Sequence, residues 1–550
     1  MGGWGDEGMR NDTCHPERAQ ILSERSESKD RHLIASRDLH FTGDAIADPS
    51  TSLGMTAKER PCQARVPGTG ARHRICRLRT AISSHLLIPA LVLATACNFA
   101  PPHVQPPLPT PAAYDPSLNV ADGREPRAPE IGWRQFFRDP RLTALIATSL
   151  DYNRDLRVAV GRIDVARGQY RIQGADRIPT VNATAGYQRT HTGADATGIP
   201  NQQSFTLDRG FISLGVTSFE LDFWGRVRNL TSAAKASYLA TVQAQRAFQL
   251  SLIQDVAATY FAQLETAEQI RLADTTVRSR REVLRIATVR QRAGLTSALD
   301  VRSAESLLAQ AEASRAALGL IQVQVNTQLQ VLLGAPTAGP LPAPLGLAQQ
   351  TDTTLLGAGL PSELLLVRPD ILGAEETLRS AEANIGAARA AFFPTISLTG
   401  AWGFASSALN ALVGLDGLTW NAGPQATTPI FNRQRLRGNA DVARAQGRIA
   451  LAEYERTIQV AFKEVTDALA GRRYLAEQVA AQERATVADR AIAQLAISRY
   501  REGVASYLEV LDAERTLFAS EQQLLRLRRT NEENLVALYI ALGGGVIERH

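Results

Sequence analysis

The residue types that most often do chemistry are unevenly distributed in this 550-residue sequence. All four cysteines lie near its start, at Cys14, Cys62, Cys76 and Cys97. Histidine is almost as sparse beyond them, where the sequence contains only His103, His191 and His550. A Cys/His metal site or nucleophile pair therefore lacks its residues there, and no intrachain disulfide can join parts of the chain beyond Cys97. We expect the chain to be no enzyme and to need no cofactor or metal.

The polar residues with the most suggestive spacing lie near the C-terminal end. Leu508, Asp512 and Arg515 are four and three positions apart, which places them along one face of a helix, with Glu509 beside Asp512. Repeated around a symmetry axis, this face would form rings of carboxylates and leucines, which select cations and constrict pores. The alternative is a solvated helix face with a local Asp512–Arg515 pair, worth only ~0.3 kcal/mol.

A glycine precedes this pattern, and the same arrangement occurs earlier in the chain. Four residues of the earlier arrangement recur 209 positions later. They are Arg292, Gly294, Ser297 and Leu299, which correspond to Arg501, Gly503, Ser506 and Leu508. A glycine near a helix end permits a turn. We therefore expect two helix-to-helix turns, with Asp300 and Glu509 at equivalent positions.

The similarity extends over two halves of the chain. Between the regions that follow Asn153 and Arg368 the offset is 215, so that Pro179 corresponds to Pro394. From Arg226 onward the offset is 209. Two homologous repeats account for this pattern. We attribute the change in offset to a difference in loop length at residues 192–203.

Each repeat shows the same succession of elements. An amphipathic helix is expected first, as at residues 139–171, followed by alternating strand-like runs such as 181–187 and 211–219. Proline-free helical stretches follow, at about 223–291 and 432–500. Such a helix is ~100 Å long at 1.5 Å per residue, far longer than a globular domain needs.

The four expected strands, each with one apolar face and one polar face, are too few to form a closed membrane barrel within one chain. An open sheet edge is not tolerated in lipid, and about eight strands is the lower bound for a membrane barrel. The strands of one chain must therefore be completed by other copies, and three copies would supply twelve. The alternative is a soluble helical scaffold with the strand-like runs as loops.

The first part of the chain resembles an export signal. Residues 71–97 combine basic residues, an apolar run at 86–96 that is too short to span a bilayer, and small residues before Cys97. This favours a lipoprotein signal with a lipidated Cys97, although Ala94 replaces the usual leucine, and cleavage after Ala96 without lipid is the alternative. Residues 1–70 are expected to be a mis-assigned or disordered extension, and 98–130 a proline-rich tether. Residues 98–550 contain 47 Lys and Arg against 44 Asp and Glu, and this near balance gives no reason to expect nucleic acid as a partner.

Several motifs in this order resemble one known family. They are Cys97 with the proline-rich segment that follows it, Trp133–Leu142, Asn153–Leu156, Glu220–Arg228, Val367–Ile371 and Arg501–Glu514. Together they resemble the outer membrane factor (TolC-type) family, and most closely its lipoprotein branch that serves resistance-nodulation-division efflux pumps. The resemblance implies a mainly α membrane protein, a homotrimer with a twelve-stranded β-barrel, four strands per chain, that continues into a twelve-helix periplasmic α-barrel. The repeats would span 131–335 and 362–545, joined by a linker at 336–361.

The resemblance also implies a function and its sites. The chain would be a lipid-anchored outer-membrane channel of a Gram-negative-type bacterium, passively conducting small molecules from a periplasmic adaptor (membrane fusion protein) and an inner-membrane transporter. A type I protein secretion duct is the functional alternative. The adaptor would dock at the turns formed by Gly294, Leu295 and Thr296 and by Gly503, Val504 and Ala505. The alternative is an ordinary helix hairpin that binds no partner. The periplasmic aperture would involve Tyr500, Leu508, Glu509, Asp512, Arg515 and Asp300.

Overall fold

The structure is a computed structural model that describes residues 98–118, 127–197, 203–336, 339–351, 356 and 361–545. The chain divides into two compact units, 1–81 and 82–550, and every described residue belongs to the second. The expectations for residues 1–70, for the signal at 71–97 and for lipidation of Cys97 concern positions outside the described residues.

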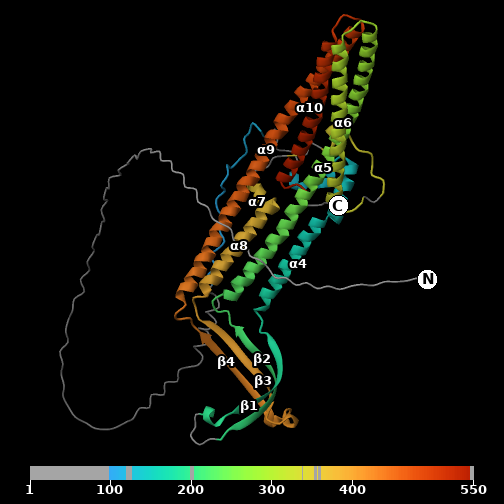
Figure 1. Ribbon diagram of the computed structural model, residues 1–550. Helices are drawn as coiled ribbons and strands as arrows, with labels where there is room; N and C mark the ends of the chain where they lie inside the picture. Colours follow the sequence, from blue (N-terminus) through green and yellow to red (C-terminus); the bar gives the residue numbers. More distant parts are fainter. Residues whose placement is uncertain are drawn as a thin grey trace, which may run out of the picture. The chain divides into compact units, whose positions relative to one another are not determined.

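The described chain combines long helices with one four-stranded sheet (Figure 1). The first half contains η2 (Ala128–Glu130), α2 (Trp133–Phe136), α3 (Pro140–Tyr152), α4 (Arg154–Ala175), β1 (Val181–Thr192), η3 (Ala194–Thr197), β2 (Phe205–Glu220), α5 (Arg226–Arg292) and α6 (Ala298–Leu333). The second contains η4 (Leu347–Gln349), η6 (Pro361–Glu363), α7 (Leu364–Val367), α8 (Pro369–Ala390), β3 (Thr395–Ser406), η7 (Leu409–Ala411), η8 (Leu415–Gly417), β4 (Leu418–Thr427), α9 (Arg433–Arg501) and α10 (Tyr507–Ala541). Helices α5 and α9 confirm the two long helical stretches expected from the sequence.

The expected single lead-in helix at 139–171 is wrong, because the structure breaks it into α3 and α4 at Asn153. The Asn153 side chain accepts a hydrogen bond from the Leu156 amide at 2.8 Å and so caps α4. Its amide nitrogen donates to the Leu332 carbonyl at 2.9 Å. Residues at the start of the apolar pattern are buried, whereas Val160 in α4 is 47% exposed.

The change in offset between the repeats also has a different origin from the one expected. The segments that connect β1 to β2 and β3 to β4 have similar lengths, whereas β2 has 16 residues and β4 has 10. The difference between the two strands equals the change in offset from 215 to 209. The first repeat therefore has a longer second strand, rather than a longer loop.

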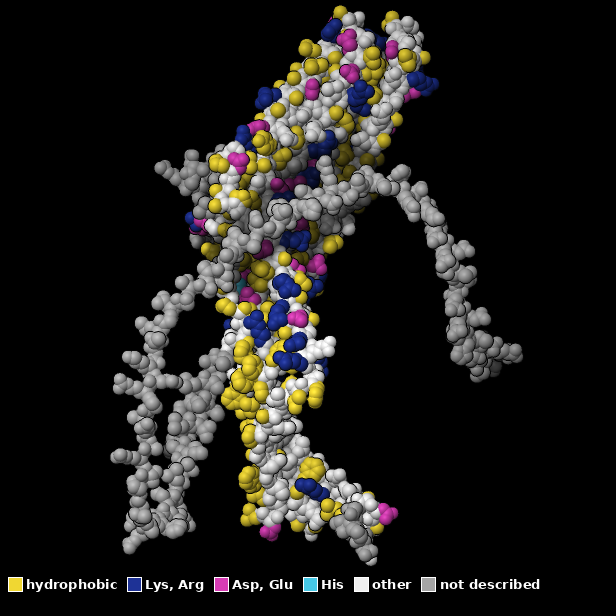
Figure 2. Space-filling view, turned by 90° about the vertical axis from the view of Figure 1, so that its left-hand side faces the viewer, with side chains coloured by type: hydrophobic (Ala, Val, Ile, Leu, Met, Phe, Trp, Pro, Cys, Tyr) yellow, Lys and Arg dark blue, Asp and Glu magenta, His cyan; other side chains and the backbone are white. Residues whose placement is uncertain are grey.

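The four strands form an antiparallel sheet in the order β1-β2-β3-β4, with two chemically different faces. Side chains alternate along a strand and paired residues share a face. One face carries apolar residues from every strand, among them Val181, Ile212, Leu214, Leu398, Trp402, Leu418 and Trp420. The other carries small and polar residues, among them Thr184, Ser213, Thr399, Gly403 and Thr419. In Figure 2, yellow side chains line one side of the sheet at the bottom of the view.

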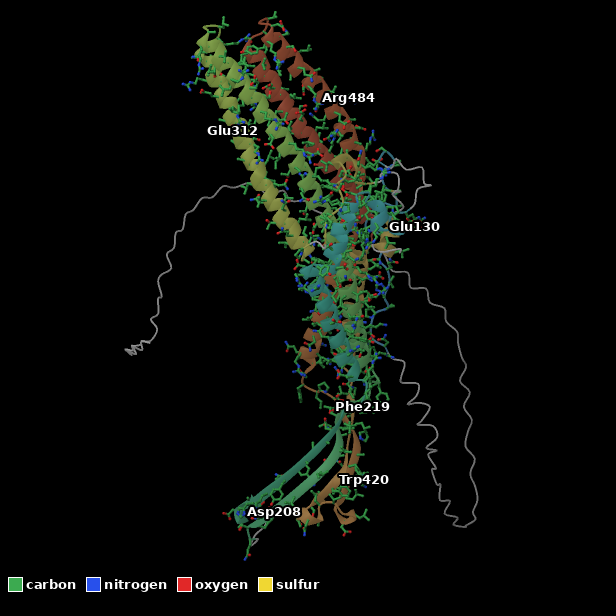
Figure 3. The ribbon with its side chains drawn as sticks, turned by 90° about the vertical axis from the view of Figure 1, so that its right-hand side faces the viewer. Glu130, Asp208, Phe219, Glu312, Trp420 and Arg484 are labelled. Atoms are coloured by element: carbon green, nitrogen blue, oxygen red, sulfur yellow. The ribbon has the colours of Figure 1, made fainter. Side chains whose placement is uncertain are left out.

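The turn from the sheet into α5 is fixed by the Glu220–Arg228 motif. Arg226 forms an ion pair with Glu220, and the Arg228 amide donates to Asp222 at 2.7 Å. Gly225 has φ 73°, a left-handed conformation that favours glycine. The long helix thus starts directly from the strand, and Figure 3 shows Phe219 in this transition and Trp420 in the sheet, with Arg484 on the helical part.

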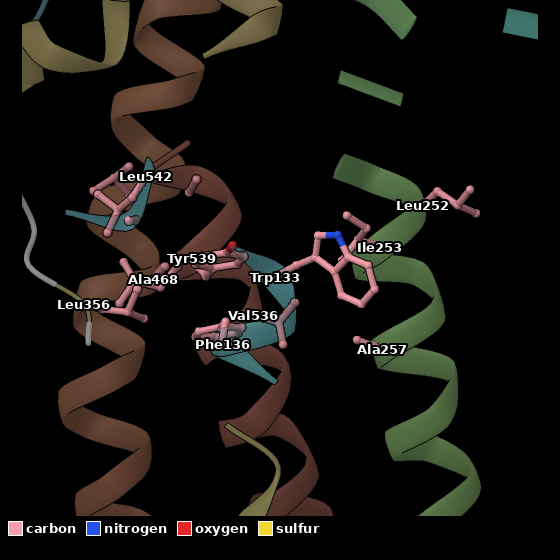
Figure 4. Packing of buried hydrophobic residues seen from close by; sticks show 14 of the residues in the cluster. Trp133, Phe136, Leu252, Ile253, Ala257, Leu356, Ala468, Val536, Tyr539 and Leu542 are labelled. Carbon is pink, nitrogen blue, oxygen red and sulfur yellow. The ribbon is translucent and has the colours of Figure 1, made fainter. Parts of the chain in front are cut away.

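Beyond the sheet, the main core lies where the short helices α2 and α3 meet α5, α9 and α10 (Figure 4). The rings of Phe136 and Tyr539 stack with centroids 4.1 Å apart, and the Tyr539 hydroxyl donates to the Ile131 carbonyl at 2.6 Å. The Tyr260 hydroxyl donates to Asp139 at 2.8 Å. Tyr260 and Tyr539 therefore bury their rings with hydrogen-bonded hydroxyls, and the Tyr539 contacts tie the second repeat to the first in one core.

The proline-rich segment at 98–118 packs against the second repeat. The His103 ring nitrogens lie 2.9 Å from a Glu382 carboxylate oxygen and 3.2 Å from one of Glu375. The Tyr114 ring stacks on Phe462 with centroids 5.2 Å apart. The described part of this segment is therefore held along α8 and α9.

His103→Ala is expected to loosen this segment, because it removes the contacts of His103 with Glu375 and Glu382 of α8. Limited proteolysis of the purified protein should cut within residues 98–118 several-fold faster than in wild type. His191→Ala is the matched control, since His191 is exposed on β1 and, among the described residues, forms a side-chain hydrogen bond with Thr206 at 3.0 Å. Equal cleavage rates for wild type and His103→Ala would show that the two links do not hold the segment.

Candidate functional site

The turn between α5 and α6 is a Schellman motif, which closes a helix with a left-handed residue. Gly294 has φ 73°, its amide donates to the Gln291 carbonyl at 2.9 Å, and the Leu295 amide donates to the Arg290 carbonyl at 2.9 Å. No atom lies near the position of a Gly294 Cβ, so its conformation rather than space requires glycine. The Leu295 side chain is 76% exposed.

The turn between α9 and α10 repeats this geometry. Gly503 has φ 76°, its amide donates to the Tyr500 carbonyl at 3.0 Å, and the Val504 amide donates to Arg499 at 3.0 Å. Val504 is 70% exposed. Each of these two turns, called tips below, therefore presents an apolar side chain to solvent directly after its glycine. The side chain is Leu295 in the α5–α6 tip and Val504 in the α9–α10 tip.

The two tips differ in how the next helix begins. Ser297 and Asp300 form a capping box at the start of α6, and the Thr296 hydroxyl also donates to Asp300. The Thr296 hydrogen bond lowers the pKa of the Asp300 carboxyl, which stays ionised at neutral pH. Ser506 makes no side-chain cap bond at the start of α10. Glu509, the counterpart of Asp300, instead lies 3.8 Å from Arg499.

Asp300→Ala should therefore destabilise the first tip by ~1 kcal/mol, the usual cost of losing an N-cap partner. Amide hydrogen exchange of residues 297–303 is expected to accelerate about fivefold, which corresponds to that energy. Glu509→Ala is the matched control at the second tip, where no such cap exists. Unchanged exchange in Asp300→Ala would rule out a capping role for this carboxylate.

Tyr500 is the most enclosed of the expected aperture residues. It is 8% exposed and packs with Tyr507, Val510 and Ala493 in a small core near the tips. The Arg290 guanidinium lies 4.6 Å from the Tyr500 ring centroid, in a cation–π contact between α5 and α9. Its buried hydroxyl has no hydrogen-bond partner among the described residues.

Four of the other expected aperture residues line two grooves beside α10. Leu508, Asp512 and Arg515 share a groove of about 380 Å³ with Arg302 and Ser306 of α6. This is the shared helix face that the sequence predicts. Leu508 is 72% exposed, and Arg515 donates to Asp512 at 3.0 Å.

Glu509 lines the second groove, of about 460 Å³, together with Arg499 and Asp512. Asp512 therefore borders both grooves, whereas Asp300 bonds within its own tip and contacts neither groove.

Two arginines of this region were missed in the sequence. Arg290 contacts Tyr500, and Arg499 lies beside Glu509. They are equivalent positions of the two repeats, because 290 and 499 differ by 209. The repeat alignment could have found them, although only three-dimensional packing shows which side chain each one meets. No cluster of His, Cys, Asp and Glu that could hold a metal ion occurs in the described ranges.

The two repeats contact each other through α5 and α8. Ser380 of α8 donates to the Ala233 carbonyl at 3.0 Å, and its hydroxyl lies 2.9 Å from that of Ser237. A Cβ at Gly373 would lie 3.4 Å from the Gln243 Cβ and 3.7 Å from the Ala240 carbonyl. Small residues thus let the two helices approach closely.

The surfaces of α4 and α9 that correspond, in the other repeat, to this α8–α5 contact are exposed to solvent in the single chain. The counterparts of Gly373, Ser380 and Ala387 are Val158, Val165 and Ile172, which are 53%, 61% and 73% exposed. The counterparts of Ala233 and Ala240 are Val442 and Ile449, both 57% exposed. In the part of the chain that the structure describes, α9 packs against α8 and α10 rather than α4. Each chain therefore presents two complementary apolar stripes at opposite sides.

None of the described helices is both long and apolar enough to span a bilayer.

Comparison with known proteins identifies relatives along most of the chain. The model of the family described as "Outer membrane efflux protein" matches residues 145–335 and 360–544. The toluene efflux pump outer membrane protein TtgI of Pseudomonas putida is 41% identical over 461 residues, 83% of this chain and 97% of the relative. The cation efflux system protein CusC of Escherichia coli is 39% identical over 456 residues, which cover 82% of this chain and 97% of the relative.

Solved structures agree with these relatives. The open state of the Neisseria gonorrhoeae MtrE outer membrane channel gives a TM-score of 0.74 at 36% identity and covers 82% of this chain and 99% of that one. A membrane protein of Pseudomonas aeruginosa gives a TM-score of 0.76, also at 36% identity, and covers 81% of this chain and 100% of that one. The resemblance inferred from the sequence motifs is confirmed, and the chain belongs to the outer membrane efflux protein family.

Proposed function

We propose that three copies of this chain close into a duct through the outer membrane, which passively conducts small molecules delivered by a periplasmic adaptor and an inner-membrane transporter. The chain itself performs no catalytic step in this proposal. Energy comes from the inner-membrane transporter, and the duct supplies only a path.

The observation that carries the proposal is the pair of uncovered stripes on α4 and α9. Their counterparts on α8 and α5 pack together within the chain, so a corresponding contact, with Val and Ile in place of the small residues, can join α9 of one copy to α4 of the next. Such a head-to-tail interface forms a ring when its rotation closes. The edge strands β1 and β4 require partners in the same way, because an unpaired sheet edge is not tolerated in lipid. Three copies give twelve strands, which exceeds the minimum for a closed barrel.

The faces of the sheet support an orientation for this barrel. The apolar face, with Leu214, Trp402 and Trp420, suits lipid, and the face with Thr184 and Ser213 suits a watery lumen. The relatives named above are a toluene efflux pump protein and a cation efflux system protein. These names favour small molecules or ions over secreted proteins as the cargo. A lipid on Cys97 would add an anchor at the start of the mature chain.

We assign adaptor docking to the two tips, with Leu295 and Val504 as apolar contacts and Gly294, Thr296, Gly503 and Ala505 forming their turns. Cysteines introduced at Thr296 or Ala505 should form disulfides with cysteines in the tip of a co-expressed adaptor. Cysteine at Gly193, in an open position of the β1–β2 loop, is the control at the other end of the chain. Cross-links from Gly193 alone would place the adaptor elsewhere.

We assign the periplasmic aperture to Leu508, Glu509, Asp512 and Arg515, which a threefold ring would bring around one axis. Tyr500 and Asp300 would contribute polar links between neighbouring tips, and the unpartnered Tyr500 hydroxyl supports this.

Asp512→Ala is expected to weaken block by divalent cations about tenfold and to raise the single-channel conductance in planar bilayers. It removes one carboxylate per copy from the ring and frees Arg515 from its ion pair. Asp441→Ala is the matched control, because Asp441 forms the same kind of exposed pair with Arg444 far from the tips. Wild-type conductance and cation block in Asp512→Ala would exclude Asp512 from the aperture. The absence of any channel in wild-type bilayers would instead contradict the duct itself.

A further inference from the structure

The connection between β3 and β4, residues 407–417, is unusually apolar for an exposed loop. Leu409, Val413 and Leu415 are 67%, 76% and 90% exposed. Asp416 is the only charged residue in this connection. The short turns η7 and η8 give it a defined shape, with the Gly417 amide donating to the Gly414 carbonyl at 3.0 Å. An ordered loop thus exposes three large aliphatic side chains within seven residues.

The loop folds toward the apolar face of the sheet. A Cβ built on Gly210 of β2 would lie 3.4 Å from Leu409 Cδ2 and 3.8 Å from Leu412 Cδ1. Side chains alternate along a strand, so position 210 shares its face with Ile212 and Leu214. Leu409 and Leu412 therefore extend the same apolar face rather than the polar face.

The other hairpin marks where this face becomes polar. Tyr187 of β1 pairs with Gly210, and the next residues on that face, Arg189 and Asp208, form an ion pair at 3.3 Å. A tyrosine followed by an ion pair is typical of the boundary between acyl chains and lipid headgroups. The aliphatic residues of the β3–β4 loop begin at this same level, since Gly210 also pairs with Ser406.

We propose that the β3–β4 loop is a membrane anchor, which lies on the outer side of the barrel with Leu409, Val413 and Leu415 inserted into the outer leaflet. The proposal rests on the assignment of the apolar sheet face to lipid. We assign lipid as the partner of this loop because the loop continues the apolar sheet face and packs on Gly210 from that side. A lid over the pore would instead have to fold over the polar face. Aliphatic side chains at the headgroup boundary add binding in proportion to the apolar area they bury.

The test uses single cysteines at Val413 and Leu415 in the full chain, labelled with an environment-sensitive fluorophore and reconstituted in phosphatidylcholine vesicles. Wild-type protein treated in the same way measures labelling of its own cysteines, none of which follows Cys97. We expect blue-shifted emission that a lipid-borne nitroxide quenches and aqueous iodide does not. Quenching by iodide alone would place the loop in water at the pore mouth and overturn the proposal. Protection from both quenchers would place it between copies and also overturn it.

Cysteines at Leu214 and Ser213 separate this proposal from the one on which it rests. Leu214 lies on the apolar face and Ser213 on the polar face of β2. Lipid quenching at Leu214 but not at Val413 would refute only the loop anchor. Lipid quenching at Ser213 and not at Leu214 would refute the orientation of the barrel.

Discussion

Ile449→Asp is expected to leave the chain folded but unable to assemble into a ring. Ile449 is 57% exposed in the single chain, so a carboxylate there meets water and the fold tolerates it. In the ring, the same position faces the Val158–Val165 stripe of the next copy, where an unpaired carboxylate would be buried. Such burial costs several kcal/mol at each of three interfaces, which opposes assembly. Light scattering of the purified protein in detergent should give the mass of one chain.

Arg444→Asp is the matched control for this experiment. It also adds a carboxylate to α9, but its repeat counterpart is Lys235, which is exposed on α5. The lost Arg444–Asp441 ion pair is exposed and contributes little. This variant should assemble like wild type. A normal assembly of Ile449→Asp, or equal disruption by Arg444→Asp, would contradict an interface at the Ile449 stripe.

Glu532→Gln is expected to remove a pH-dependent loss of stability. Glu532 of α10 is 5% exposed, and burial raises its pKa from 4.5 to about 7. Below pH 4.5 the carboxyl is neutral in the folded and unfolded states. Between the two pKa values only the folded state keeps the proton, so the free energy of unfolding falls as pH rises and the full loss remains above about 7. The loss is roughly 3 kcal/mol for a shift of this size.

Thermal unfolding at about pH 5 and about pH 8 measures this effect. Glutamine keeps the acceptor for the Thr351 hydroxyl, which donates to Glu532 at 2.7 Å, so Glu532→Gln should gain stability over wild type mainly at the higher pH. Thr351→Val should act in the opposite direction, because that hydrogen bond lowers the pKa of Glu532. A stability difference between wild type and Glu532→Gln that stays the same at both pH values would contradict the argument.

Much of this fold could be predicted because the sequence is periodic over long distances. Helices α5 and α9 contain no proline and few residues that disfavour a helix, and both end at glycines that the repeat alignment pairs. The strands could be predicted because apolar and polar residues alternate, as in 211–219. The shared helix face of Leu508, Asp512 and Arg515 followed from helical spacing alone, whereas the groove that they form with α6 did not.

The errors arose where one side chain outweighs the periodic pattern. Asn153 breaks the lead-in helix because its amide both caps α4 and bonds to α6, and the second contact is long-range. The longer β2 was mistaken for a longer loop because length alone does not show where pairing stops. The role of Val158, Val165 and Ile172 was also hidden, since only the packing of their counterparts on α8 shows that such a stripe has a partner.

The Ser237–Ser380 contact supplies the most direct test of a ring of three copies. Its repeat counterparts are Gln446 of α9 and Val165 of α4, which should face each other across neighbouring copies. A chain that carries Gln446→Cys and Val165→Cys, oxidised in the outer membrane and separated under denaturing conditions, should give covalent species that end at three chains. Either single variant should give none of these species. Monomers alone from the double variant, or a ladder that continues beyond three chains, would contradict the closed ring.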